Sequence, residues 1–319
     1  MQAGKDRPGD GPSGSVLLSG ASGMLGQALR AGLAADGWSV TRLVRRAAAA
    51  GDEVRWNPTS DGAIDAPERL EGLAAALHLS GANISAHRWT GAWKQAMWAS
   101  RVESTRVLSE RLAGLRNRPE VLVCASAIGW YGDRGDAWLD EEATAGSGYF
   151  PELCAAWEAA ARPAAEAGIR VVHLRLGIVL GRRGGALERM LPLFRAGLGG
   201  RLGDGRQWMS WIGEADAVRA FLFGMRCQAL RGAVNGVAPE PVINREFTRA
   251  LAQAVRRPAL LPAPAWALRL AFGEMADAAL LASARVVPRR LLEAGFRFQH
   301  AQLADALSIA TASHVPVLG

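Results

Sequence analysis

Short apolar runs alternate with amphipathic stretches along the first 180 residues of the chain. The apolar runs predict strands at Val16–Leu18, Ser39–Val44, Glu53–Trp56, Ala75–Leu79, Val121–Ala125 and Arg170–Leu176. Apolar residues at helical spacing predict helices over Met24–Asp36, 91–114 and 151–167. Because the strands are apolar throughout, helices are expected to cover both faces of the sheet. This alternation predicts an α/β fold with a doubly wound parallel sheet.

Beyond residue 180 the pattern weakens into helices, glycine loops and proline breaks. This shift predicts a small C-terminal α/β substrate region that completes a cleft. We expect residues 1–14 to be a disordered tail and residues 15–240 to be a nucleotide-binding domain, with substrate-region segments from about 180. Residues 241–319 are expected to form a C-terminal domain. Within it, the apolar stretch 264–282 is interpreted as a core or dimer helix.

Composition excludes several classes of protein. The three cysteines (Cys124, Cys154 and Cys227) are far apart, which argues against a disulfide framework or a cysteine zinc site and indicates a reducing compartment. No secretory signal or membrane span is recognisable, so we expect a soluble cytoplasmic protein that is not an integral membrane protein. The net charge of +7 comes from scattered arginines, so anionic ligands are favoured over nucleic acid.

A glycine-rich turn follows the first strand and opens the first helix. Its sequence, GASGMLG, places Gly20, Gly23 and Gly26 where a chain bends, lets a pyrophosphate approach, and packs helix on strand. The helix N-terminus adds N–H groups that bind phosphate. We therefore predict a Rossmann-type dinucleotide site, with cofactor contacts from the turn residues Gly20, Ser22, Gly23, Met24, Leu25 and Gly26.

The end of the second strand favours one dinucleotide over the other. Folds that prefer NAD carry Asp or Glu there for the ribose 2′-hydroxyl, whereas this chain has Val44, Arg45 and Arg46. Since a guanidinium binds phosphate bidentately, Arg45 favours NADP(H). The alternative is that both arginines are solvated loop residues.

Several longer motifs carry a family resemblance. GASGMLG, HLSGANI (78–84), SAIGWYG (126–132), LRLGIVLG (174–181) and GDGRQWMSWI (203–212) resemble an extended short-chain dehydrogenase/reductase. More narrowly, RWTGAWKQAMWASRVEST (88–105), WEAAA (157–161), GGALERMLPLFRAGLGG (184–200) and the segment from Arg257 to Phe298 resemble its atypical "epimerase family" branch in the NAD(P)-dependent epimerase/dehydratase superfamily. That branch has a C-terminal domain of unknown function. The resemblance covers residues 15–310.

The resemblance implies further contacts with NADP(H). Val44 and Arg45 would hold the adenosine 2′-phosphate end, and the segment Leu79, Ser80 and Gly81 would cover the middle of the cofactor. Ile178 and Val179 would line the nicotinamide. Arg101 would reach an anionic part of the cofactor, with a surface helix arginine as the alternative.

The catalytic residues of the wider superfamily are incomplete here. Hydride-transferring members use Ser, Tyr and Lys, the last two in a YxxxK motif, and Ser126 stands in the serine's place. Counting from Glu158 places Phe150 and Cys154 at the other two positions, and neither can do that proton chemistry. Tyr131 is the first candidate for a substitute acid or base, with a packing tyrosine as the alternative.

Other chemically distinctive residues are given simpler interpretations. The run Asp140, Glu141 and Glu142 is expected to be mostly solvent-facing, and His78, inside an apolar strand, is interpreted as a packed histidine. No His, Asp or Glu cluster has metal-ligand spacing, so no metal is expected.

Aromatic and polar residues predict where a substrate would bind. Most of the eleven tryptophans are interpreted as packing residues, but some could form an aromatic wall for a ligand. Candidate contacts are Trp130, Gln207, Trp208 and Ser210.

Two functions follow from these patterns. The first is an NADP(H)-dependent oxidoreductase or epimerase acting on an unknown small molecule, with a homodimer as one option. The alternative is a non-catalytic NADP(H)-binding regulatory or scaffold protein, for example a division-related one.

Overall fold

The core of the protein is a seven-stranded sheet whose strand pairs are all parallel. The computed structural model describes residues 14–58 and 64–312. The sheet order is β11-β7-β5-β4-β1-β2-β3. These strands are β1 (Ser15–Ser19), β2 (Ser39–Val44), β3 (Glu53–Arg55), β4 (Ala75–His78), β5 (Val121–Ala127), β7 (Arg170–Leu176) and β11 (Gly232–Gly236). The order reverses between β1 and β4, which makes this the Rossmann-like arrangement predicted from the sequence.

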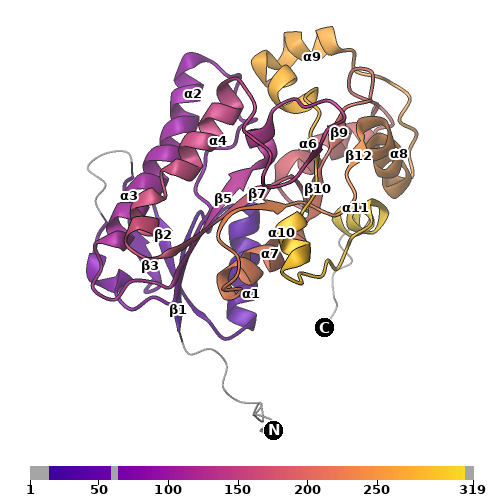
Figure 1. Cartoon of the computed structure of the whole chain (residues 1–319). Coiled ribbons are helices and arrows are strands. Elements are labelled where there is room, and N and C mark those ends of the chain that lie inside the picture. Colours follow the sequence, from indigo (N-terminus) through magenta and orange to yellow (C-terminus); the bar gives the residue numbers. More distant parts are fainter. Residues whose placement is uncertain (1–13, 59–63, 313–319) are drawn as a thin grey trace.

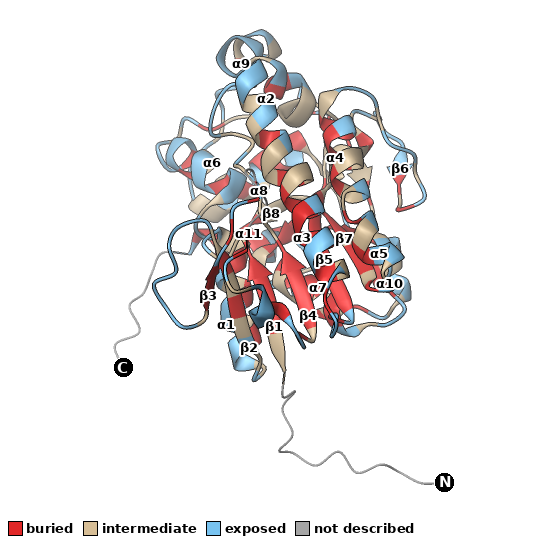
Figure 2. Ribbon diagram, turned by 90° about the vertical axis from the view of Figure 1, so that its left-hand side faces the viewer, coloured by how far each residue is buried: buried red, intermediate tan, exposed pale blue. Residues whose placement is uncertain are grey.

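Helices cover both faces of the sheet (Figures 1 and 2). One face carries α2 (Gly91–Trp98), α3 (Ser104–Ala113), α4 (Tyr149–Ala159) and α5 (Arg162–Glu166); the other carries α1 (Met24–Ala35), α7 (Glu214–Arg226) and α10 (Arg289–Glu293). Alternate strand residues enter different cores: Val16 and Leu18 pack toward α1, whereas Leu17 packs toward α3. This double burial explains why the strands are apolar throughout.

A second region lies beyond the carboxyl ends of the strands (Figure 1). It contains α6 (Gly185–Arg195), α8 (Asn244–Val255), α9 (Ala265–Phe272) and α11 (Leu303–Thr311). Its short strand pairs are β8 (Ile178–Leu180) with β10 (Trp211–Gly213), β9 (Trp208–Met209) with β12 (Val242–Ile243), and β6 (Trp138–Leu139) with β13 (Arg285–Val286). Four short helical turns complete the described elements: η1 (Pro67–Leu70), η2 (Ala99–Glu103), η3 (Ile128–Tyr131) and η4 (Ala276–Leu280).

The structure corrects three helix predictions. The stretch 151–167 is two helices, α4 and α5, and Pro163 lies in the first turn of α5, where a missing N–H is tolerated. A π-helical turn, η2, interrupts the helix predicted over 91–114. The stretch 264–282 ends as an α-helix at Phe272, because Gly273 takes a left-handed φ of 62°.

The core-helix interpretation of residues 264–282 is also wrong for α9. Trp266 and Leu270 of this helix are 68% and 72% exposed, and only Leu268 is buried. The dimer interpretation stays a prediction. The predicted tail, residues 1–14, lies outside the described residues except for Gly14. Across the two described ranges, no helix has the length and apolar character to cross a membrane.

Candidate functional site

The glycine turn joins β1 to α1 at the point where the strand order reverses. Gly20 has a φ of 71°, and a methyl group on it would lie 2.6 Å from the Leu79 carbonyl oxygen. A methyl group on Gly26 would lie 2.1 Å from the Gly20 oxygen, so both positions require glycine. Gly23 is the N-cap of α1; no side chain caps the helix, and no acidic residue lies in its first turn. The helix N-terminus therefore offers its N–H groups to an anion.

Arg45 lies directly after β2, at the same edge of the sheet. The neighbouring Arg46 is already paired with Glu53, with 2.6 Å between Nη2 and Oε1, and this pairing holds the Glu53 pKa at about 2. Arg45 is exposed and has no carboxylate partner within the described part of the chain. It therefore keeps a free guanidinium beside the glycine turn.

The predicted cofactor segment Leu79, Ser80 and Gly81 follows β4, next to the same turn. Within it, the Leu79 N–H donates to Ser19 Oγ at 3.2 Å, which ties the two strand ends together. His78, the residue before Leu79, has no exposed surface. Its interpretation as a packed histidine is confirmed.

Arg101 extends from η2 toward the segment that follows β4. Its Nη2 donates to the Ala82 carbonyl at 2.9 Å, and a methyl group on Gly81 would lie 3.3 Å from its guanidinium carbon. The residue is 8% exposed, so the surface-arginine alternative is wrong. Among residues 14–58 and 64–312 it has no carboxylate partner, and burial lowers its pKa. It is a desolvated cation beside a backbone segment predicted to cover an anionic cofactor.

Ser126, at the end of β5, hydrogen-bonds to a buried ion pair. Its hydroxyl donates to Glu158 Oε1 at 2.7 Å. Arg175 grips the same carboxylate through Nε at 2.8 Å and Nη2 at 2.9 Å, and its guanidinium lies 3.9 Å from the ring centre of Trp130. The predicted catalytic serine is 3% exposed, and its hydroxyl proton is donated to Glu158.

Tyr131 belongs to this network and has no exposed surface. Its hydroxyl donates to Asn235 Oδ1 at 2.7 Å and accepts from Arg175 Nη1 at 3.1 Å. Burial raises the pKa of the phenol. In this conformation the hydroxyl reaches no surface from which a substrate could be contacted, so its catalytic role stays a prediction that the geometry does not support.

Phe150 and Cys154 lie on the side of α4 that is buried. The Phe150 ring fills the space where a side chain on Gly129 would otherwise sit, only 2.6 Å from such a methyl group. Cys154 is fully buried, and burial raises its pKa to about 12. Neither side chain offers a proton donor or acceptor near neutral pH.

The residues predicted to contact substrate are largely committed to internal contacts. The Ser210 hydroxyl donates to Ala284 O at 2.8 Å, and the Gln207 amide donates to Leu202 O and Leu280 O. Trp208 lies against Arg285, 3.9 Å from its guanidinium. Ile178 and Val179, predicted to line the nicotinamide, are the first two residues of β8 and are half-buried.

Sequence reasoning missed the charged partners of this network. Arg175 lies within an apolar strand, and an arginine in such a strand signals a buried pair. Glu141 was expected to face solvent, but it is 7% exposed and accepts from the Asn235 and Arg290 N–H groups. Glu141 is buried because the Asn235 N–H, on the edge strand β11, needs a hydrogen-bond acceptor.

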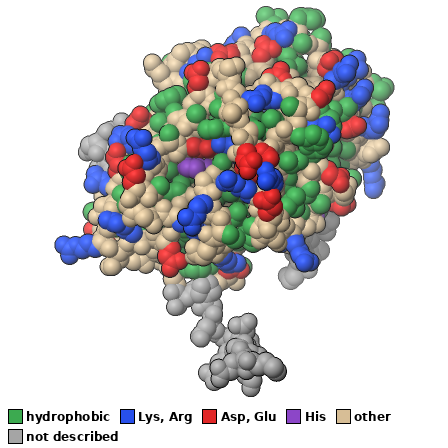
Figure 3. Space-filling model, in the orientation of Figure 1, with side chains coloured by type: hydrophobic (Ala, Val, Ile, Leu, Met, Phe, Trp, Pro, Cys, Tyr) green, Lys and Arg blue, Asp and Glu red, His purple; other side chains and the backbone are tan. Residues whose placement is uncertain are grey.

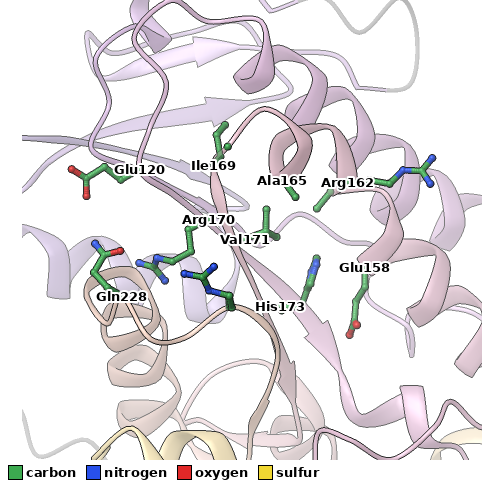
Figure 4. Close-up of a pocket in the computed structure, with 13 residues that line it drawn as sticks. Glu120, Glu158, Arg162, Ala165, Ile169, Arg170, Val171, His173 and Gln228 are labelled. Carbon is green, nitrogen blue, oxygen red and sulfur yellow. The ribbon is translucent and has the colours of Figure 1, made fainter.

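A groove of about 930 Å³ opens on the flank of the sheet, away from the glycine turn (Figure 4). It is lined by residues from the starts of β7 and β11 and from α5. Glu158 and His173 also line it. Burial lowers the His173 pKa. Figure 3 shows basic and acidic side chains interspersed across one face of the molecule. The glycine turn, Arg45 and Arg101 do not line the groove, whereas Glu158, which accepts from Ser126 at the end of β5, does.

Comparisons with known proteins agree with this fold. The model of the NAD dependent epimerase/dehydratase family matches residues 16–235, and a domain of unknown function matches residues 263–310. An epimerase family protein of Mycobacterium bovis is 47% identical over 296 residues, covering 93% of this chain and 97% of the relative. A chloroplastic homologue of epimerase family protein SDR39U1 in Arabidopsis thaliana is 34% identical, covering 92% and 85%.

A solved structure is similar over nearly the whole chain. The human epimerase family protein SDR39U1, crystallised with NADPH, superposes with a TM-score of 0.86 at 32% identity, covering 93% of this chain and 99% of that one. With the glycine turn, the sheet order and the matched family model in agreement, the chain belongs to the NAD dependent epimerase/dehydratase family.

Proposed function

We propose that this protein binds NADP(H) at the carboxyl edge of the sheet and uses it in an oxidoreductase or epimerase reaction on a small molecule. The observation that carries the proposal is the glycine turn. Gly20 and Gly26 pack too closely for any side chain, and α1, whose N-terminus no side chain caps, begins directly after this turn. The NADPH found with human SDR39U1 supports the same assignment.

Two arginines suit the charge of this cofactor. Arg45 would bind the adenosine 2′-phosphate, which NADPH carries and NADH lacks. Arg101 would bind an anionic part nearer the glycine turn, because its buried guanidinium has no carboxylate of its own within the described ranges. When bound, the cofactor supplies or accepts a hydride, while the chain holds and orients it.

A second candidate function is a non-catalytic NADP(H)-binding protein. One observation favours it specifically: every side chain predicted to move a proton is already occupied. The Ser126 hydroxyl donates to Glu158, Tyr131 is buried, and Phe150 takes the tyrosine position. In this case the cofactor would act as a signal, so NADPH and NADP⁺ would bind with different affinities and change the binding of a partner.

The test is a titration with NADPH and with NADH, followed by quenching of tryptophan fluorescence. NADPH is expected to bind more tightly than NADH, and Arg45→Ala should remove that preference. Arg111→Ala, which removes an exposed arginine from α3, is the matched control and should leave both affinities unchanged. If neither nucleotide binds the wild-type chain, the proposal is wrong.

A substrate screen then separates the two candidates. Carbonyl compounds, alcohols and nucleotide sugars are incubated with the NADP⁺- or NADPH-loaded protein, and absorbance of the reduced nicotinamide is followed. Hydride transfer that Gly26→Ala abolishes supports an enzyme. Tight binding without turnover, together with unequal affinities for NADPH and NADP⁺, supports the regulatory function.

A further inference from the structure

His78 connects three elements that meet at the proposed cofactor site. It is the last residue of β4. Its Nδ1 lies 2.6 Å from Ser19 Oγ at the end of β1, and its Nε2 lies 3.4 Å from Ser104 Oγ at the start of α3. Ser19 and His78 are 0% exposed and Ser104 is 1% exposed, so no water competes for these contacts.

The surrounding hydrogen bonds fix the direction of each contact. The Ser104 hydroxyl donates to the Ser100 carbonyl at 2.7 Å, which leaves its oxygen to accept from Nε2–H. Ser19 Oγ accepts from the Leu79 N–H, and its own proton points to Nδ1. A neutral ring with its proton on Nε2 satisfies all of these groups. Burial lowers the His78 pKa to about 3, consistent with a neutral ring.

Each serine adjoins a part of the cofactor site. Ser19 precedes Gly20, the first residue of the glycine turn. Ser104 directly follows η2, the π-helical turn that carries Arg101. Because Ser104 is the first residue after this π-turn, its contact with His78 anchors the end of the turn that carries Arg101. The guanidinium itself donates to the Ala82 carbonyl at 2.9 Å.

We propose that His78 is a positioning residue that sets both the glycine turn and Arg101 against the end of β4. The inference rests on the proposed NADP(H) site. It assigns the two ring nitrogens different roles: the Nδ1 bond to Ser19 fixes the spacing of the two strand ends, and the Nε2 bond to Ser104 fixes the aim of Arg101.

Conservative variants separate these two roles. In His78→Asn, the side-chain oxygen replaces Nδ1 and still accepts from Ser19, while the bond to Ser104 is lost. In His78→Gln, the longer amide replaces Nε2 and still donates to Ser104, while the bond to Ser19 is lost. Ser104→Ala removes the hydrogen bond between His78 Nε2 and Ser104 without changing the histidine. It tests the same role if His78→Asn fails to fold.

The measurement is NADPH affinity by fluorescence titration, alone and combined with Arg101→Met. We expect Ser104→Ala and His78→Asn each to weaken binding by roughly 10- to 100-fold, the same loss as Arg101→Met, because a misplaced guanidinium no longer bonds the cofactor. Adding Arg101→Met to either should weaken binding little further, because Arg101 is already misplaced. In His78→Gln, Arg101→Met should keep its full effect.

Leu112→Ala is the matched control for general loss of stability. Leu112 is fully buried on α3 and is remote from the glycine turn in the contacts it makes. It should lower the melting temperature and leave NADPH affinity unchanged. If the His78 variants behave like Leu112→Ala, or if their effects simply add to that of Arg101→Met, His78 is only a packing residue and the inference is overturned.

Failure of the inference is distinct from failure of the proposed function. If wild-type protein binds no NADPH, the proposed function is wrong and this inference falls with it. If wild-type protein binds NADPH and the His78 and Ser104 variants bind it equally well, only the positioning role is refuted.

Discussion

Replacing Arg101 by methionine separates the two roles that a buried cation can have at this position. If Arg101 binds an anionic cofactor, its buried charge lowers the stability of the cofactor-free protein and increases the affinity for the cofactor. If Arg101 is there to hold the Ala82 carbonyl, its removal should weaken the fold in both states. Methionine is similar in length and apolar, so it fills the space without charge.

The structure sets the size of each effect. Because the guanidinium is charged, its hydrogen bond to Ala82 O, at 2.9 Å, contributes about 1.5–3 kcal/mol to stability. Against this, replacing a buried ion pair by apolar side chains of similar volume is often neutral or stabilises a protein by about 1–4 kcal/mol, and a lone buried charge lacks the partner that offsets its desolvation. Arg101 is 8% exposed and has no carboxylate partner among the described residues, so the second effect should exceed the first. We expect the cofactor-free variant to be more stable than wild type, by up to about 2.5 kcal/mol.

NADPH binding should change in the opposite direction. A hydrogen bond to a charged group contributes about 1.5–3 kcal/mol, which corresponds to a roughly 10- to 100-fold weaker affinity when it is lost. The assay is thermal unfolding with and without NADPH. The variant should melt higher than wild type without NADPH, and NADPH should raise its melting temperature far less.

Arg101→Lys is the matched control, because it keeps the charge without the planar guanidinium. It should lose part of the affinity and gain little stability. A lower melting temperature for Arg101→Met, with an unchanged NADPH affinity, would refute the reasoning and make Arg101 a structural residue.

Three further outcomes follow from the same contacts. Gly26→Ala should destabilise the chain and abolish NADPH binding, because the added methyl would lie 2.1 Å from the Gly20 oxygen. Gly51→Ala is the control, because a methyl group there would have no atom within 4 Å. It should change neither the melting temperature nor the NADPH affinity. Glu158→Gln should cost about 3–5 kcal/mol in denaturant unfolding, since it leaves the Arg175 guanidinium, 3% exposed, without its carboxylate. Arg162→Ala, which breaks an exposed pair with Glu166, should cost less than about 1 kcal/mol. Burial lowers the His78 pKa to about 3 in the folded protein, against 6.5 in the unfolded chain. As the pH decreases, the unfolded state therefore binds this proton first. The free energy of unfolding should fall between pH 6.5 and pH 3, by up to about 1.4 kcal/mol per pH unit. His78→Asn should reduce that slope by one proton. An unchanged slope in His78→Asn would show that His78 is not buried in its neutral form.

The sequence by itself determined the sheet and its glycine turn. Strand and helix periodicity is a property of short windows, and burial on both faces leaves strands such as β1 and β7 apolar along their whole length. The spacing of the turn is equally local, because Gly26 approaches Gly20 and Ala21, although the close approach of Gly20 to Leu79 joins two strand ends that are distant in sequence. The place of Arg45, directly after β2, follows from the same alternation.

Only the tertiary structure decided which polar groups remain free. Tyr131 and Ser126 looked like candidate catalytic groups, yet Asn235 and Glu158 take up their hydroxyls. Glu141 looked solvated, yet it satisfies the edge of β11. The apolar surface of α9 looked like core, yet Trp266 is exposed. Each outcome depends on segments far apart in the chain that become neighbours only on folding. A polar side chain is available to a ligand only when no such neighbour satisfies it, and no local pattern records that.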